Sequence, residues 1–140
     1  MKMVFIVFTL LLLAIGFLSC VTNENNLNEK NLPDLEGKVL LNQQDLIEIF
    51  SEKRVATFSF GSGNMATAYY FPDGTQRIAG EKGMDEGKYK IEKGQLCSKW
   101  KKIRKGKEEC YKIYRSEGNK FILIKPDGSS DSTMVFKEIF

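Results

Sequence analysis

Short apolar segments separated by turn-forming residues run through the chain from residue 55 to residue 137. Two copies of Pro-Asp-Gly, at 72–74 and 126–128, interrupt these segments. Proline fixes φ at the first turn position and glycine adopts the left-handed conformation, so both copies predict hairpin turns. In chain order, the eight expected strands are 55–60, 65–71, 75–79, 88–92, 95–103, 109–115, 120–125 and 133–137. Short strands at this spacing indicate an antiparallel β-meander.

Eight strands paired in sequence order must either close on themselves or leave two exposed edges. We therefore expect an all-β fold, an up-and-down barrel of calycin-like shape that is closed or half-open. A two-sheet sandwich is the alternative arrangement of the same strands.

One short helix is expected before the first strand, over residues 43–51. Asn42 can cap it, and Asp45 lies in the first turn, near the positive end of the helix. Leu46, Ile49 and Phe50 fall at i, i+3 and i+4 and form a single apolar stripe. So short a helix must pack against other elements to be stable, and we expect it to cap the barrel.

The N-terminus predicts export. A lysine at position 2 precedes an apolar run from residue 4 to residue 18, about as long as the core of a signal peptide. Ser19-Cys20 resembles the lipobox of bacterial lipoprotein precursors, which implies cleavage before Cys20 and a diacylglyceryl group on its sulfur. Residues 1–19 are then the signal peptide. An uncleaved membrane anchor and soluble secretion are the alternatives.

Export with lipidation predicts a bacterial lipoprotein that is anchored in a membrane of the cell envelope and faces the periplasm. Residues 20–36 are polar and aperiodic, and we expect a tether there. Residues 37–140 are expected to form a single β-domain.

Composition excludes several kinds of chemistry. The chain contains no histidine, which rules out Ser-His and Cys-His nucleophiles and every zinc site built on imidazole. Its 21 basic side chains nearly balance 18 acidic ones, which argues against a nucleic-acid partner. No cofactor or metal site is expected.

Cys97 and Cys110 remain as an even pair once Cys20 bears lipid, and in an exported protein they predict a structural disulfide. A redox-active dithiol is the alternative. A hairpin that turned at Lys105-Gly106 would place Cys110 opposite Lys101 instead. The bridge therefore requires a turn nearer Ile103-Arg104, a wide or bulged loop, or another register.

A basic run lies between the two cysteines. Six cations occur within residues 99–107 with no acidic residue among them: Lys99, Lys101, Lys102, Arg104, Lys105 and Lys107. They are candidates for contact with an anionic surface of the envelope. The alternative is a solvated hairpin tip with Trp100 turned into the core beside Leu96.

Two further motifs offer weaker candidates. Gly61-Ser62-Gly63 lacks the lysine of a phosphate-binding loop and is expected to be a strand connection. Asp85, Glu86 and Asp131 could pair as glycosidase carboxylates, but they fall at predicted turns, where solvated acids are common.

Five segments together resemble a family of small secreted bacterial proteins known as a domain of unknown function, numbered 995. These segments are Leu46–Ser51, Tyr70–Thr75, Gly87–Tyr89, Leu96–Trp100 and Glu109–Arg115, and the resemblance spans residues 41–128. Tyr89 stands where that family favours tryptophan. The resemblance implies a compact β-domain with a bridge between Cys97 and Cys110, and it implies no activity.

The sequence as a whole favours a non-enzymatic lipoprotein of the cell envelope. Its expected partners are the membrane, through the lipid on Cys20, and an envelope protein, an anionic lipid or a small apolar ligand. An inhibitor-like or accessory envelope protein that acts through a protruding loop is the second hypothesis. A carboxylate-based enzyme is the third.

Overall fold

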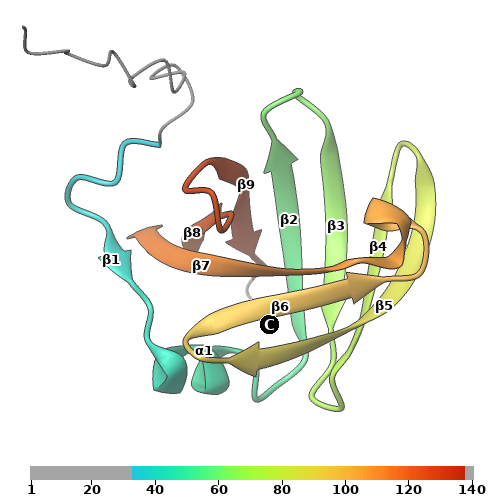
Figure 1. The fold of residues 1–140 in the computed structure, drawn as a ribbon, viewed down its shortest axis with the longest axis horizontal. Helices are drawn as coiled ribbons and strands as arrows, with labels where there is room; N and C mark the ends of the chain where they lie inside the picture. Colours follow the sequence, from blue (N-terminus) through green and yellow to red (C-terminus); the bar gives the residue numbers. More distant parts are fainter. Residues whose placement is uncertain (1–32, 138–140) are drawn as a thin grey trace, which may run out of the picture.

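The computed structural model describes residues 33–137, so the predicted signal peptide, Cys20 and the tether up to residue 32 lie outside the described part. The described elements, in chain order, are β1 (Val39–Leu40), α1 (Gln43–Ile49), β2 (Arg54–Phe60), β3 (Met65–Tyr70), β4 (Thr75–Gly80), β5 (Gly83–Glu92), β6 (Gln95–Trp100), the 3-10 helix η2 (Ile103–Gly106), β7 (Glu108–Glu117), β8 (Lys120–Ile124) and β9 (Ser130–Phe136) (Figure 1).

The eight strands β2–β9 form a closed antiparallel barrel. Each pairs with the next along the chain, and β9 returns to pair with β2. The predicted meander and its closure are therefore confirmed. The short strand β1 adds to β7 through the pairs Val39–Arg115 and Leu40–Tyr114. In the described residues no helix is long and apolar enough to span a membrane.

Both Pro-Asp-Gly segments form the expected turns, and the same backbone conformation and hydrogen bonds stabilise each. Gly74 and Gly128 have φ values of 83° and 86°. In each turn the aspartate carboxylate, of Asp73 or Asp127, accepts hydrogen bonds from the backbone N–H and the hydroxyl of the residue two positions on. These local hydrogen bonds stabilise the turn relative to an extended backbone.

Large side chains fill the barrel. Alternation along the strands sends every second side chain inward. The core includes Ala56, Phe58, Ala68, Tyr70, Tyr89, Leu96, Tyr111, Ile113, Phe121, Leu123, Met134 and Phe136. Trp100 is also buried, as expected from its position on the Leu96 face of β6.

Helix α1 closes one end of this barrel (Figure 1). Asn42 and Asp45 form a reciprocal capping box, which confirms Asn42 as the N-cap. Phe50, at the C-cap, lies 5.0 Å from Tyr70, 5.5 Å from Tyr89 and 5.8 Å from Phe136 between ring centroids. This aromatic cluster joins the short helix to the core, as its length requires.

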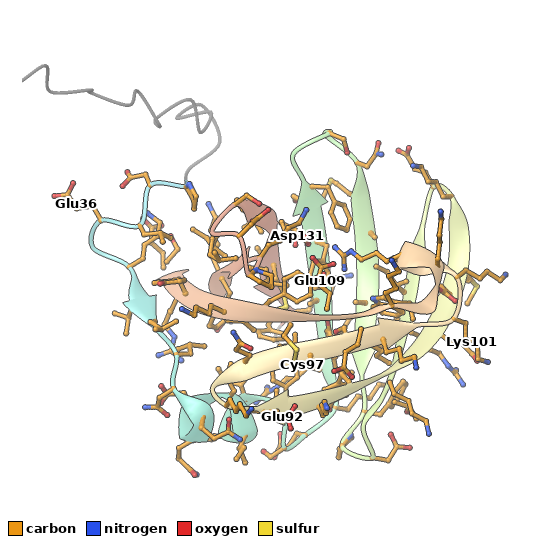
Figure 2. All side chains as sticks on the ribbon, in the orientation of Figure 1. Glu36, Glu92, Cys97, Lys101, Glu109 and Asp131 are labelled. Carbon is orange, nitrogen blue, oxygen red and sulfur yellow. A yellow bond between two sulfur atoms is a disulfide. The ribbon has the colours of Figure 1, made fainter. Side chains whose placement is uncertain are left out.

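The disulfide between Cys97 and Cys110 is present (Figure 2). The two residues are direct cross-strand partners on β6 and β7. This register arises because β6 ends at Trp100, three residues before the predicted strand end, and η2 then makes a wide connection to β7. The strand predicted to reach Ile103 is thus shorter, and the turn lies nearer Ile103-Arg104.

The expectation that Asp85, Glu86 and Asp131 occupy turns is wrong. β5 begins at Gly83 rather than Lys88, so Asp85 and Glu86 are strand residues, and Asp131 lies within β9. The turn before β5 consists only of Glu81 and Lys82, because Gly80 pairs directly with Gly83. Asp85 then points inward, 7% exposed, while Glu86 points outward.

Candidate functional site

A pocket of about 400 Å³ opens at the end of the barrel opposite α1. It lies between the β2–β3 hairpin, the β4–β5 hairpin and the η2 loop, and we call it the mouth pocket. Its lining residues are Phe60, Ser62, Asn64, Met65, Ala66, Ile78, Gly80, Glu81, Lys82, Gly83, Met84, Asp85, Lys102 and Ile103. This volume falls within the range of about 300–1,000 Å³ that small-molecule sites occupy.

Apolar side chains from three different segments meet in the mouth pocket. Phe60 and Ile78 pack against the core. Met65, Met84 and Ile103 are 56%, 71% and 36% exposed, respectively. Methionine adapts its shape to an apolar surface through its flexible thioether chain. A partly buried wall with an exposed methionine rim can bind an apolar group of variable shape.

Asp85 fixes the η2 loop beside this pocket. Its carboxylate accepts hydrogen bonds of 2.9 Å from the backbone N–H groups of both Lys102 and Ile103. Burial by itself would raise the pKa of Asp85, but these N–H groups outweigh it and hold the pKa below its ordinary value. The buried acid is therefore a structural anion that positions Ile103 in the pocket wall.

The η2 loop also contains Arg104, which turns toward the barrel rather than toward solvent. Its guanidinium lies 2.5 Å from a carboxylate oxygen of Glu109 and 2.7 Å from one of Asp131. Figure 2 labels both acids, which extend from β7 and β9. The guanidinium also lies 5.2 Å from the ring centroid of Tyr111, within cation–π distance.

Arg104 and Lys105 both have positive φ, 53° and 55°. Residues other than glycine rarely adopt this conformation, which persists only where surrounding contacts impose it. The two acids around Arg104 and the Asp85 carboxylate supply those contacts. The η2 loop is thereby held against the barrel at two points.

The six cations of the basic run do not form one surface. Lys99 and Lys101 lie beside the outer face of β5 and β6, where Lys101 pairs with Glu86 at 3.0 Å. Lys102 lines the mouth pocket, and Arg104 pairs with Glu109 and Asp131. Lys105 and Lys107 are exposed on the η2 connection.

The glycine-rich segment and the three candidate carboxylates do not come together in one site. Gly61-Ser62-Gly63 is the tip of the β2–β3 hairpin, as expected. Asp85 and Glu86 point to opposite faces of β5, so they do not form a carboxylate pair. Asp131 is bound to Arg104.

Within residues 33–137 one group of side chains has metal-ligand spacing: Cys97, Glu108 and Cys110. Its two sulfurs are bonded to each other, so neither is a thiolate that could bind a metal.

The inward position of Asp85 and the separate role of Arg104 were not predicted from the sequence. A signal for the first does exist, because glycines at 80 and 83 flank a two-residue turn and start β5 early enough to place Asp85 on the inner face. Arg104 differs in no local feature from the lysines around it.

Comparison with known proteins adds no relative: no family model, curated protein or solved structure matches this chain. The resemblance to the domain of unknown function therefore stays a prediction.

Proposed function

We propose that this protein binds a small apolar ligand in the mouth pocket and is a non-catalytic lipoprotein of the cell envelope, anchored through Cys20. The observation that supports this function most directly is the convergence of Phe60, Ile78 and Ile103 around an open space of about 400 Å³. The positions of these side chains depend on the closed barrel and on the Asp85 contact to the η2 loop.

The depth of the pocket limits the ligand. Tyr70, Leu96, Ile113 and Met134 are 2% exposed or less and occupy the barrel interior. The ligand therefore binds across the mouth and not along the barrel axis. A compact apolar molecule, or one end of a longer one, suits this site.

A second candidate function is supported by the exposed rim. Met65 and Met84 project far enough to contact a protein partner, whose apolar side chain would then occupy the same pocket. This is the accessory-protein hypothesis in a modified form, because the η2 loop is fixed against the barrel by Asp85 and Arg104 and does not protrude freely.

Fluorescence of the neutral dye Nile red tests the proposed function. In the mature chain, residues 20–140 with Cys20→Ser, which carries neither the apolar run 4–18 nor lipid, we expect saturable binding of the dye and its displacement by 1-octanol. The double variant Met65→Gln/Met84→Gln should raise the Kd at least about fivefold, because both residues lie at the rim of the pocket.

The matched control is Val39→Gln, which replaces an equally exposed apolar side chain on β1, away from the mouth. It should leave the Kd unchanged. Absence of saturable dye binding, or equal loss in the control, would overturn the ligand-binding function.

A further inference from the structure

A second and larger hollow, of about 740 Å³, lies on the outer face of β4, β5 and β6. It is separate from the mouth pocket and shares no lining residue with it. Four cations line it: Arg77, Lys88, Lys99 and Lys101. Cations therefore outnumber the two acids of its lining, Asp73 and Glu86, by two.

Lys88 and Lys99 are direct cross-strand partners on β5 and β6. Like charges in this position repel and destabilise a sheet. Neither lysine forms an ion pair with any residue between 33 and 137. The sheet thus retains an unfavourable pair of charges beside an open space.

Two carboxylates near the facing lysines are engaged by other cations. Glu86 pairs with Arg77 at 3.4 Å and with Lys101 at 3.0 Å. Glu108, the cross-strand neighbour of Lys99, instead pairs with Lys90 at 3.5 Å. Asp73, which also lines the hollow, accepts hydrogen bonds from the backbone N–H and hydroxyl of Thr75 and pairs with neither lysine.

Gly87, next to Lys88 on β5, allows β5 and β6 to approach closely beside the hollow. A Cβ at this position would clash with the backbone carbonyl oxygen of Lys99, so β5 and β6 approach each other in a way that only glycine permits. Gly87 is the β5 partner of Trp100 and lines the hollow with it. The absence of a side chain at Gly87 brings the β5 and β6 backbones together next to the two facing lysines.

We propose that this hollow binds a phosphate group. Its cations exceed its two carboxylates, Asp73 and Glu86, by two charges, which matches a doubly charged phosphate. Lysine binds phosphate as a point charge, and two facing lysines would contact the same anion from neighbouring strands. The bound anion would relieve the repulsion between Lys88 and Lys99. The phosphate can belong to inorganic phosphate or to the headgroup of an anionic lipid.

The test combines stability with binding, using the Cys20→Ser chain and the double variant Lys88→Gln/Lys99→Gln. Without phosphate, the double variant should melt at the same temperature as the parent or higher, because the like-charge repulsion is gone. Inorganic phosphate should raise the Tm of the parent more than chloride does at equal ionic strength. The double variant should lose this difference, and titration calorimetry should show at least tenfold weaker phosphate binding.

Lys112→Gln is the matched control, since Lys112 is exposed on the outer face of β7 and does not line the hollow. It should retain the phosphate effect.

Vesicles distinguish the two sources of the phosphate group. Sedimentation with phosphatidylglycerol vesicles but not with phosphatidylcholine vesicles, lost in the double variant, would identify a lipid headgroup. Binding of inorganic phosphate alone would identify a soluble ligand. Binding of neither, binding that the double variant retains, or a double variant that is less stable than the parent would each overturn the proposal. All these outcomes are independent of the mouth pocket.

Discussion

The Asp85 carboxylate accepts a 2.9 Å hydrogen bond from the backbone N–H of Ile103 and thereby fixes the η2 loop to the inner face of β5. A second bond of the same length, from the N–H of Lys102, reinforces it. One buried acid therefore determines where an apolar wall of the mouth pocket lies. The first prediction follows from this contact.

Asp85→Asn should lower the free energy of unfolding by about 1–3 kcal/mol at pH 7, because hydrogen bonds to a charged acceptor are the stronger ones. The pKa of Asp85 is lowered in the folded state. Its contribution is therefore complete above the ordinary value of 3.8 and is lost as the pH falls through the lowered one. In urea unfolding between pH 2 and pH 7, the free energy of unfolding should fall less steeply with decreasing pH for the variant than for the parent. If the unfolding free energies of parent and variant fall equally with pH, the ionised Asp85 carboxylate does not stabilise the fold.

Loss of the hydroxyl should destabilise the fold at one buried tyrosine, Tyr89, and not at another, Tyr111. The Tyr89 hydroxyl donates a 2.6 Å hydrogen bond to the carbonyl of Phe71, so Tyr89→Phe should cost about 0.5–1.5 kcal/mol. The Tyr111 hydroxyl is buried without a partner among the described residues. Tyr111→Phe should therefore be neutral or stabilising, by up to about 1 kcal/mol. Chemical denaturation of both variants checks this, and destabilisation of Tyr111→Phe would show that its hydroxyl has a partner in solution.

Removal of the disulfide should destabilise the barrel without opening it. Cys97 and Cys110 are 13 residues apart, and a bridge over a loop of this size contributes about 3 kcal/mol. The Cys97→Ser/Cys110→Ser variant should therefore lose about that much in urea unfolding and keep its β-sheet circular dichroism. Reduction of the parent should reproduce the loss. A variant as stable as the oxidised parent would refute the structural role.

Lipidation predicts a simple change in fractionation. The parent chain should enter the detergent phase on Triton X-114 partitioning, because two or more acyl chains give stable anchoring. The chain of residues 20–140 with Cys20→Ser should move to the aqueous phase, and mass spectrometry of the parent should find a diacylglyceryl adduct on Cys20. An unmodified Cys20 with residues 1–19 still attached would exclude the lipoprotein assignment.

Much of the barrel could be predicted from the sequence because its determinants are local. Pro-Asp-Gly marks a turn whatever lies around it, and alternation on each strand identifies the inner face. The residue at which β6 ends is not determined by local sequence. Trp100 stops the strand only because the chain must continue into η2, which Asp85 fixes from another hairpin.

The candidate site was harder to predict because its residues acquire their roles from distant partners. Arg104 is held against the barrel only through Glu109 and Asp131, which lie on β7 and β9. The facing of Lys88 and Lys99 does follow from the predicted strands 88–92 and 95–103, because their two-residue connection pairs residue 92 with residue 95 and so residue 88 with residue 99. The contacts of Arg104 are encoded in no single segment.

Methionine methyl NMR tests the central claim most directly. Met65 and Met84 line the mouth pocket, whereas Met134 is fully buried in the core and acts as an internal reference. Titration of 1-octanol into the Cys20→Ser chain should shift the Met65 and Met84 methyl signals along saturable curves with one common Kd and leave Met134 in place. If Met65 and Met84 do not shift, or if Met134 shifts more than they do, the mouth pocket is not the ligand site.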